Sequence, residues 1–391
     1  MDISVFLLIG IAASIFVGFN IGGSSTGIAW GPAVGADLIK KTTAAGLMTF
    51  FVFLGGWTVG RNVMDTLAGD IITIPITLEA GIAVLFFIGL GILIANIFGV
   101  PVPTSMTTVG AIAGLGLATG TLNWETMGRI VSWWVVTPVI GFWIGAMIGR
   151  YLYPHLDQRF SVAKSEGSLL VVDRSRPIPR PSLGPNTTRQ ELFGTVVVII
   201  VACYMAFSAG ASNVPNAVAP LVSSGAIEVN TGIAIATVAI GVGGFTIARR
   251  TMDSVGGELS DISLLAAVIV MVTAASITTF LSYIGIPISL VMATIMTIVG
   301  LGWGRATRSV AGREIGQVVR EKTEPDMPMG AITTETPDEI TKIGETESRA
   351  VREATELFNP RAVMKYVSMW IIGPTVSLGL SYLFFVVVPF V

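Results

Sequence analysis

The chain has 391 residues, of which 52% are hydrophobic and 12% charged, and its formal net charge is -2. Soluble domains carry about 25% charged residues, so this composition excludes an ordinary soluble globular protein. The net charge offers no electrostatic basis for binding nucleic acid. A single cysteine and a single histidine exclude a disulfide framework and a histidine-based metal cluster.

Eight apolar runs are long enough to cross a bilayer, which takes roughly 20 residues. The first run begins after an acidic residue and has no basic residues before it, so we interpret it as a retained helix rather than a signal peptide. The sequence therefore predicts an all-α polytopic membrane protein. We expect its spans at 3–20, 43–60, 78–99, 128–150, 192–210, 230–248, 262–284 and 362–391.

Four shorter segments are rich in Gly, Ser, Thr, Asn and Pro, and each directly follows a long apolar run. They are 22–38, 101–119, 213–226 and 287–304. Polar, interrupted backbone is tolerated in lipid only where it is buried in protein or lines a cavity. The segments thus predict broken or re-entrant helices whose free N–H groups face inward. The alternative is close helix packing through Gly and Ser.

The two halves of the chain are related by internal repetition. The run Gly55-Gly56-Trp57-Thr58-Val59 reappears as Gly243-Gly244-Phe245-Thr246-Ile247, at an offset of 188 (243 minus 55). Residues 131–138 reappear at 367–374, at an offset of 236 (367 minus 131). The order is kept, and one insertion between the two matches explains the change in offset.

Charge is concentrated in two segments outside the spans. Residues 150–190 carry seven basic and three acidic side chains, and 305–361 carry nine basic and eleven acidic ones. We therefore divide the chain into five parts. These are a first transmembrane repeat (1–150), a basic Pro-rich linker (151–190), the first part of a second repeat (191–304), a charged insertion (305–361) and a last transmembrane helix (362–391).

The charges flanking matched segments predict that the repeats are inverted. Lys40 and Lys41 follow the first polar segment, whereas the equivalent loop of the second half carries only Glu228. Positively charged loops stay in the cytoplasm, so the matched loops fall on opposite sides. Inverted repeats with interrupted helices are a transporter architecture. We expect a multi-pass cell-membrane protein with 151–190 and 305–361 in the cytoplasm.

Two charged pairs also recur in the repeat. Arg61 and Asp65 reappear as Arg249 and Asp253. Each pair has the i,i+4 spacing of neighbours on a helix surface. The spacing predicts an ion pair near the end of a helix in each half.

The polar segments predict an anion site. A helix N-terminus presents free N–H groups and the positive end of a dipole, and hydroxyl and amide side chains can complete a cradle. None of the four segments contains Lys or Arg, so affinity would come from dipoles and hydrogen bonds. The candidate substrate-binding residues are Ser24, Ser25, Thr26, Thr104, Ser105, Thr107, Ser212, Asn213, Asn216 and Ser289.

These segments resemble the inorganic phosphate transporter (PiT) family, whose halves each carry a motif near G-A-N-D-V-A-N-A and a later P-V-S-T-T-H segment. The resemblance covers nearly the whole chain apart from 150–190 and 305–361. It implies symport of phosphate with sodium or protons between broken helices. The matching residues are Asn20, Gly210, Ala211, Val214, Asn216 and Ala217 for the first motif, Pro101, Val102, Thr104, Val109, Gly110 and Ala111 for the second, and the pairs Trp134/Pro138 and Trp370/Pro374.

The chain departs from the family motifs at their ionisable positions. The aspartate position falls on Ile21 and Asn213, and the histidine position falls on Met106 and Met292. Amides and hydroxyls offer oxygen ligands but cannot exchange a proton near neutral pH. Sodium is therefore favoured over protons as the coupling ion, and an uncoupled carrier stays an alternative. The coupling-ion candidates are Asn20, Ser24, Asn213 and Asn216, with Na⁺ expected at Asn20, Asn213 and Asn216 and no other cofactor.

We accordingly expect a secondary transporter of inorganic phosphate, not an enzyme, that works by alternating access between the repeats. One alternative is a permease for sulfate or another oxyanion, since a cage of hydroxyls and amides accepts either. Another is a non-transporting membrane sensor or accessory protein. Expected partners are the oxyanion and the lipid bilayer, with no nucleic acid. A homodimer and a cytoplasmic partner for 305–361 are both compatible with the sequence.

Overall fold

The computed structural model describes residues 4–97, 103–159, 170–173, 180–183, 188–248, 263–309 and 360–388. These residues are almost entirely helical, and in the linker two short antiparallel strands pair Leu170 with Leu183. The elements are α1 (Val5–Gly35), α2 (Lys41–Trp57), α3 (Gly60–Asp65), the π-helix η1 (Thr66–Asp70), α4 (Leu78–Ile97), α5 (Thr104–Thr119), α6 (Trp124–Met147), the π-helix η2 (Ile148–Leu152), α7 (Tyr153–Arg159), β1 (Leu170–Asp173), β2 (Arg180–Leu183), α8 (Arg189–Ser223), α9 (Val229–Thr246), α11 (Leu264–Tyr283), α12 (Leu290–Ser309) and α15 (Pro360–Val387).

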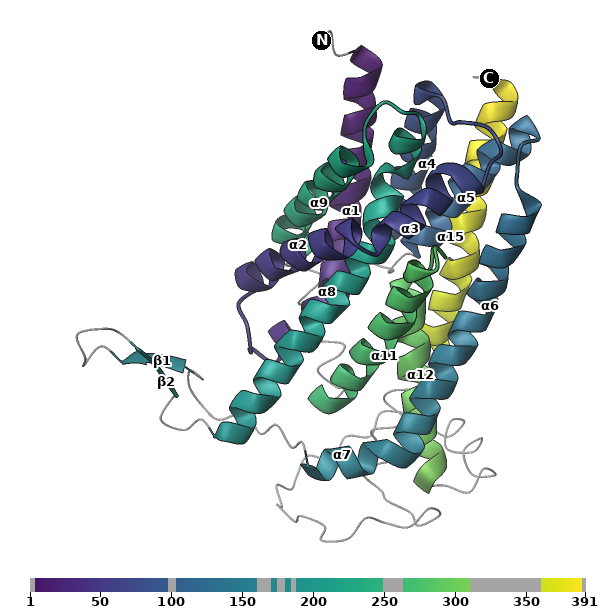
Figure 1. The fold of residues 1–391 in the computed structure, drawn as a ribbon. Coiled ribbons are helices and arrows are strands. Elements are labelled where there is room, and N and C mark those ends of the chain that lie inside the picture. Colours follow the sequence, from purple (N-terminus) through teal and green to yellow (C-terminus); the bar gives the residue numbers. More distant parts are fainter. Residues whose placement is uncertain are drawn as a thin grey trace.

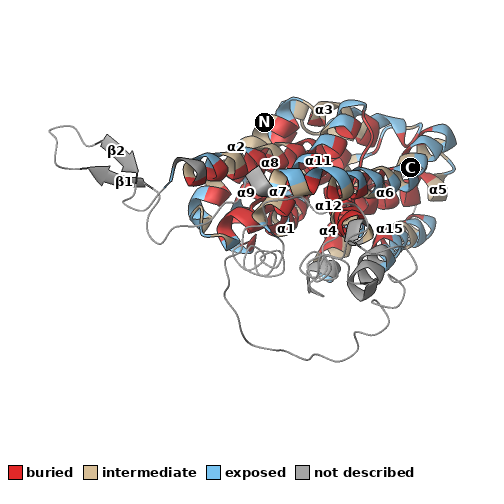
Figure 2. Cartoon of the chain, turned by 90° about the horizontal axis from the view of Figure 1, so that it is seen from below, coloured by how far each residue is buried: buried red, intermediate tan, exposed pale blue. Residues whose placement is uncertain are grey.

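Six of the described helices are long and apolar enough to cross a membrane. A seventh span is formed if α2 is taken with the segment Gly60–Asp70, from which it is bent by 63°. Large apolar side chains such as Phe50, Val135 and Ile200 are more than half exposed on the outside of the bundle. Figure 2 shows buried residues gathered in its middle. The molecule is a multi-pass membrane protein whose outer surface suits lipid.

Several helices begin at side-chain caps that the sequence provides. Thr188 accepts a hydrogen bond from the Glu191 backbone N–H at the start of α8. Asn123 accepts from the N–H groups of Glu125 and Thr126 at the start of α6. Ser263 accepts from Ala266 at the start of α11. Each cap satisfies N–H groups that the first turn of a helix leaves unpaired.

Helices of the two halves correspond one to one. The starts of α2 and α9 differ by 188 (229 minus 41), and those of α4 and α11 differ by 186 (264 minus 78). The starts of α5 and α12 also differ by 186 (290 minus 104), and those of α6 and α15 by 236 (360 minus 124). These offsets extend the repeat found in the sequence to most of the helices.

Close helix contacts repeat with the same offset. A Cβ atom added at Gly22 would lie 2.0 Å from the carbonyl oxygen of Ile240, and one at Gly210 would lie 2.2 Å from that of Val52. Both members of the second contact follow from the first by the 188 offset (22 to 210, and 240 back to 52). Only glycine permits such an approach. The packing of α1 on α9 thus reproduces the packing of α8 on α2.

Corresponding helices run in opposite directions. In Figure 1, α1 descends from the N-terminus, whereas α8 ascends toward the same end of the molecule. Helix α6 descends and α15 ascends in the same way. The end of α7, the start of α8, the end of α12 and the start of α15 all lie at the lower end of that view. This arrangement supports the predicted inverted repeats.

The prediction of helix breaks in the first motif of each half is wrong. Helix α1 continues through 22–35, and α8 continues through 213–223. Backbone amides at 23–26 and 213–217 therefore lie inside continuous helices, where i→i-4 bonds occupy them, except at Pro215, which has no N–H. Close packing through small residues, the alternative considered above, accounts for the Gly and Ser content. Breaks do occur before α5 and α12, as the prolines predicted.

The expected ion pair of Arg61 with Asp65 is also wrong. Arg61 instead donates to the Trp57 carbonyl at 2.7 Å and to the Asn230 side chain at 2.6 Å, and its guanidinium lies 4.7 Å from the centre of the Trp57 ring. The matched pair Arg249 and Asp253 lies outside the described residues. The same holds for most of the 305–361 insertion and for much of the 151–190 linker.

Candidate functional site

Five of the predicted substrate-binding residues meet in the middle of the protein. Ser25 comes from α1, Thr104 and Ser105 from the first turn of α5, and Asn213 and Asn216 from α8. All five are buried. They form what we call the neutral polar cluster, because none of these side chains ionises near neutral pH.

One hydrogen-bonded chain of the cluster joins three helices. The Thr104 hydroxyl donates to Asn213 Oδ1 at 2.6 Å, and Asn213 Nδ2 donates to Ser25 Oγ at 3.2 Å. Ser25 and Asn213 are counterparts at the 188 offset (213 minus 25). The chain therefore crosses between the two halves of the molecule at matched positions.

A second chain links α8 to the starts of α5 and α12. Asn216 Nδ2 donates to Ser105 Oγ at 2.9 Å, with a longer contact of 3.4 Å to Asn213 Oδ1. Ser105 Oγ lies 3.0 Å from the carbonyl oxygen of Ile288 and 3.5 Å from that of Ser212. Ile288 comes two residues before α12 begins. The cluster thus brings two helix N-termini next to each other.

These N-termini make the surroundings of the cluster electropositive without any charged side chain. Helix α5 begins at Thr104, preceded by Pro103, and its first N–H groups have no side-chain cap. Helix α12 begins at Leu290, where Ser289 Oγ accepts from the Met292 N–H at 3.3 Å. The positive ends of both helix dipoles therefore lie beside the cluster. Such a place favours an anion.

The other predicted residues bond their own helices. Asn20 Nδ2 donates to the carbonyl of Phe16, and the hydroxyls of Ser24, Thr26, Thr107 and Ser212 donate to carbonyls three or four residues earlier in the chain. Ser289 caps α12 as described above. These side chains lie near the cluster in sequence, but each of these bonds stays within its own segment of the chain.

The predicted sodium ligands are only partly brought together. Asn213 and Asn216 lie in contact, whereas the amide of Asn20 is directed to its own helix. Asn213 Oδ1 already accepts from Thr104, and Asn216 Oδ1 is buried without a partner. Among the described residues there is no group of three or more His, Cys, Asp or Glu that could hold a metal ion. The donor set is one of neutral oxygens, which suits Na⁺ by type.

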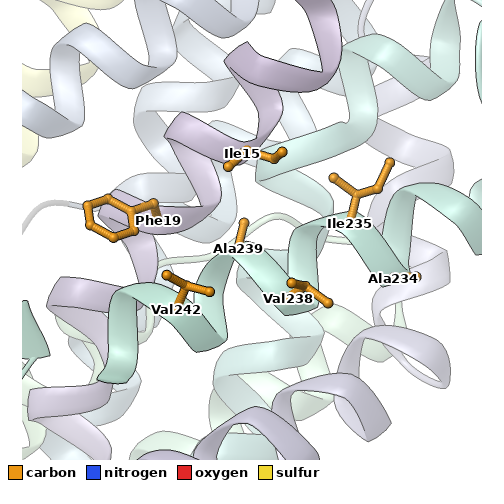
Figure 3. Close-up of a pocket in the computed structure, with 7 residues that line it drawn as sticks. All are labelled: Ile15, Phe19, Ala234, Ile235, Val238, Ala239 and Val242. Carbon is orange, nitrogen blue, oxygen red and sulfur yellow. The ribbon is translucent and has the colours of Figure 1, made fainter. Parts of the chain in front are cut away.

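A separate pocket between α1 and α9 does not suit an oxyanion. Its volume is about 360 Å³, and apolar side chains line it throughout, as Figure 3 shows. It offers no hydrogen-bond donor to a charged ligand and opens toward the lipid-facing side chains Val238 and Val242, which are 64% and 49% exposed. An anion would lose its hydration there without replacement. The lining residues are Ile15, Phe19, Ala234, Ile235, Val238, Ala239 and Val242.

Comparison with known protein families shows to which family the chain belongs. The model of the phosphate transporter family matches residues 21–381, which include both halves and the whole neutral polar cluster. The chain belongs to the phosphate transporter family.

Two similar members of the phosphate transporter family differ in the substrate that their names give. The sulfate permease CysP of Bacillus subtilis is 28% identical over 314 residues, which cover 80% of this chain and 81% of the relative. The chloroplastic inorganic phosphate transporter 2-1 of Arabidopsis thaliana is 23% identical over 393 aligned positions, which cover 78% of this chain and 67% of the relative. This chain is thus similar to members named for either oxyanion.

A solved structure has the same fold. The chain titled "The sodium-dependent phosphate transporter" aligns with a TM-score of 0.64 at 18% identity, covering 97% of this protein and 99% of that chain. At this identity the match shows the fold alone. Its near-complete coverage extends the fold of the phosphate transporter family to both halves.

The internal repeat pairs Asn213 with Ser25 rather than with Ile21. Ser25 lies within hydrogen-bond distance of Asn213 and is related to it by the 188 offset (213 minus 25). Ile21 is fully buried in the apolar core. The glycine run at 55–59 has the same offset, so this pairing was available in the sequence. Within this chain, Ser25 and Asn213 occupy matched positions of the two halves.

Proposed function

We propose that this protein is a secondary transporter that carries inorganic phosphate through the neutral polar cluster. The observation that carries the proposal is the meeting of two helix N-termini at a buried group of hydroxyls and amides. The phosphate transporter family, to which the chain belongs, is a family of transporters rather than enzymes. Within that family, the cluster is the place where this chain offers an anion both dipoles and hydrogen bonds.

The chemistry of the cluster suits capture followed by release. A dehydrated tetrahedral anion needs hydrogen-bond donors in place of water. The Ser25 hydroxyl accepts from Asn213 and can donate its own proton to the anion, and N–H groups of the first turn of α5 are also available as donors. A lysine or arginine would bind the anion as a full opposite charge and slow its departure. Partial charges are strong enough to replace water and weak enough to let the anion leave.

Sodium rather than protons drives the transport in this proposal. No side chain of the cluster can take up and release a proton near neutral pH, so the cluster itself cannot carry one. Carbonyl and hydroxyl oxygens are ligands that Na⁺ accepts. The sodium-dependent transporter that shares the fold supports this choice.

Access to the cluster alternates between the two membrane faces in the same proposal. The cluster joins α1 and α5 of the first half to α8 of the second, and corresponding helices run in opposite directions. If the two halves exchange conformations, a passage open to one face becomes a passage open to the other. The close glycine contacts of α1 with α9 and of α8 with α2 are repeated in the two halves. Packing of this kind would therefore be available to the conformation open to either face.

Sulfate is the second candidate substrate, and a specific observation favours it. The sulfate permease of Bacillus subtilis is similar to this chain over four-fifths of its length. The cluster has no carboxylate, and a carboxylate would repel the sulfate dianion. Sulfate and phosphate have the same tetrahedral shape, so only transport can separate them.

Uptake into liposomes tests the proposal. Purified protein would be reconstituted, and entry of labelled phosphate and labelled sulfate would be followed with a sodium gradient, a pH gradient or neither. We expect phosphate uptake that requires sodium and is indifferent to the pH gradient. Sulfate uptake alone would establish the second candidate. Uptake of neither anion would contradict transport and favour a sensor or accessory protein.

A further inference from the structure

We propose that Asn216 makes the site selective for oxyanions that carry a proton, and so for phosphate over sulfate. The inference rests on the proposed function and adds the residue that distinguishes phosphate from sulfate. It follows from the direction of the hydrogen bonds around Asn216, which leave one buried acceptor without a partner.

The direction of these bonds is fixed by a backbone carbonyl. Ser105 has one hydroxyl proton, and both carbonyl oxygens near it, of Ile288 and Ser212, can only accept. Ser105 therefore donates to a carbonyl and must accept from Asn216. Only the Nδ2 group of Asn216 can donate, so Nδ2 faces Ser105. The amide orientation thus follows from chemistry, and Oδ1 is the oxygen directed away from Ser105.

The side-chain oxygen of Asn216, Oδ1, is a buried hydrogen-bond acceptor to which none of the described residues donates. The residue is fully buried, and within the described part of the chain no hydrogen-bond partner reaches this oxygen. Nearly all buried polar groups in folded proteins are paired, and an unpaired one is a feature to be explained. The other amide of the cluster is satisfied, since Asn213 Oδ1 accepts from Thr104 and its Nδ2 donates to Ser25. Other buried atoms, such as Ser14 Oγ and Trp30 Nε1, are also unpaired, but the Asn216 oxygen belongs to the neutral polar cluster beside two helix N-termini. Its location in the cluster therefore makes it the point where a bound anion would donate.

Phosphate can supply this donor and sulfate cannot. Near neutral pH phosphate and arsenate keep at least one proton, whereas sulfate and selenate have none. A P–O–H group can donate to Oδ1 while its other oxygens accept from hydroxyls and helix N–H groups. Sulfate presents only acceptors, so its oxygen would face Oδ1 without a proton between them. Sites built to pair with a substrate hydroxyl reject the analogue that lacks it.

A cation is the other species that an unpaired amide oxygen attracts, but the position disfavours it. Asn216 is bonded to Ser105 in the first turn of α5, and Ser105 contacts Ile288 just before α12. Both helices direct the positive ends of their dipoles to this point. The dipoles therefore disfavour a cation at this one oxygen, and the Na⁺ of the proposed symport would bind at other neutral oxygens. The hydroxyl of a bound anion is not disfavoured in this way.

Competition in proteoliposomes tests the inference. Uptake of labelled phosphate would be measured against unlabelled arsenate, sulfate and selenate. In the unmodified protein we expect arsenate to compete about as well as unlabelled phosphate. Sulfate and selenate should need at least roughly 100-fold higher concentration for the same inhibition, because they offer no proton to Asn216 Oδ1. Equal competition by arsenate and sulfate would overturn the inference while leaving transport itself established.

Two variants and a matched control sharpen the test. The quantity to compare is the concentration of sulfate needed to halve uptake of labelled phosphate, divided by the concentration of unlabelled phosphate needed. Asn216→Leu removes the acceptor, and we expect this ratio to fall at least about tenfold. Asn216→Asp keeps acceptor oxygens, and we expect the ratio to stay the same or rise. Ser24→Ala, which removes a hydroxyl bonded only to its own helix, should leave the ratio unchanged. The proposal would be contradicted if Asn216→Leu weakened competition by both anions equally, or if Asn216→Asp lowered the ratio.

The inference remains testable if transport fails. Equilibrium binding of phosphate and sulfate to the purified, unmodified protein would then report the same preference. Uptake of neither anion would refute the proposed function. Tighter binding of phosphate than of sulfate, lost in Asn216→Leu, would still support the role of Asn216, and equal binding would refute it.

Discussion

At the scale of single residues, hydrogen-bond direction separates the residues that build the cluster from neighbours of the same type. Thr104 and Thr107 both belong to the polar start of α5, and both were predicted to bind substrate. Thr104 donates across helices to Asn213, whereas Thr107 donates to Pro103 within its own chain segment. Composition predicts that such a segment binds an anion, but rotamers decide which hydroxyl faces the site.

Thr104→Val tests this difference. Valine keeps the shape of the side chain but leaves Asn213 Oδ1 without its short bond, and an unpaired buried acceptor costs about 1–3 kcal/mol. Initial phosphate uptake at low concentration should fall by roughly 5- to 150-fold on that basis. The control, Thr107→Val, removes a bond to the backbone of its own segment and should change uptake less than about threefold. A larger effect at Thr107 than at Thr104 would show that the cluster is wrongly placed.

All five residues of the neutral polar cluster were among the ten predicted from the sequence, but only half of those ten join it. Residues next to prolines, such as Thr104 and Ser105, were found because proline predicts where a helix begins. Ser24 and Thr26 were included because small polar residues in lipid suggested a break. A hydroxyl in a helix can instead bond the carbonyl three or four residues back, and sequence does not distinguish the two outcomes. The unpaired oxygen of Asn216 depends on neighbours more than 70 residues away in the chain.

At the scale of helices, corresponding pairs are joined by different means. The Ser377 hydroxyl donates to the Thr107 carbonyl at 2.8 Å, and Ser381 donates to the Ala111 carbonyl at 2.7 Å, so α15 is bonded to α5. At the 236 offset, the matching positions on α6 are Gly141 and Gly145 (377 and 381 minus 236), which have no side chain to donate. At these two positions the α6–α12 contact is made by close packing, with 2.4 Å between a Cβ added at Gly145 and the Thr297 carbonyl oxygen.

We expect the double substitution Ser377→Ala and Ser381→Ala to loosen α5 from α15. Side-chain hydrogen bonds between membrane helices contribute about 0.6 kcal/mol each on average, so the loss should be on the order of 1 kcal/mol. Thermal unfolding in detergent would record it as a lower midpoint temperature. Ser132→Ala is the matched control, because Ser132 is exposed and bonds only its own helix at the Gly128 carbonyl. An unchanged midpoint in the double variant would mean that packing alone holds this pair.

At the scale of the whole molecule, the internal repeat could be predicted from the sequence, but the full helix correspondence and the continuity of α1 and α8 could not. The offsets of 188 and 236 could be found because glycine and aromatic residues recur at them. The offset of 186 that relates the starts of α4 and α5 to those of α11 and α12 needed the helix boundaries. The continuity of α1 and α8 also escaped prediction, because glycine normally disfavours helices. Here glycine is kept inside them by backbone contacts with α9 and α2.

Cysteine labelling can test the inversion of the halves. Lys40 and Glu228 are matched at the 188 offset (228 minus 40), both exposed, and each directly precedes its helix, α2 or α9. In a Cys203→Ser background, Lys40→Cys should react with a membrane-impermeant reagent only from the cytoplasmic side, and Glu228→Cys only from the outer side. Whole cells and inverted vesicles give the two readings. Labelling of both positions from one side would contradict inverted repeats.

The neutrality of the cluster has an electrical consequence. With no ionised side chain among Ser25, Thr104, Ser105, Asn213 and Asn216, the empty carrier would return without moving charge, and the membrane voltage would act only on its cargo. Import of a dianion against 100 mV, negative inside, is opposed by about 4.6 kcal/mol, at about 2.3 kcal/mol for each charge. Two sodium ions for each dianion would cancel that term, and a third would let the voltage itself drive accumulation.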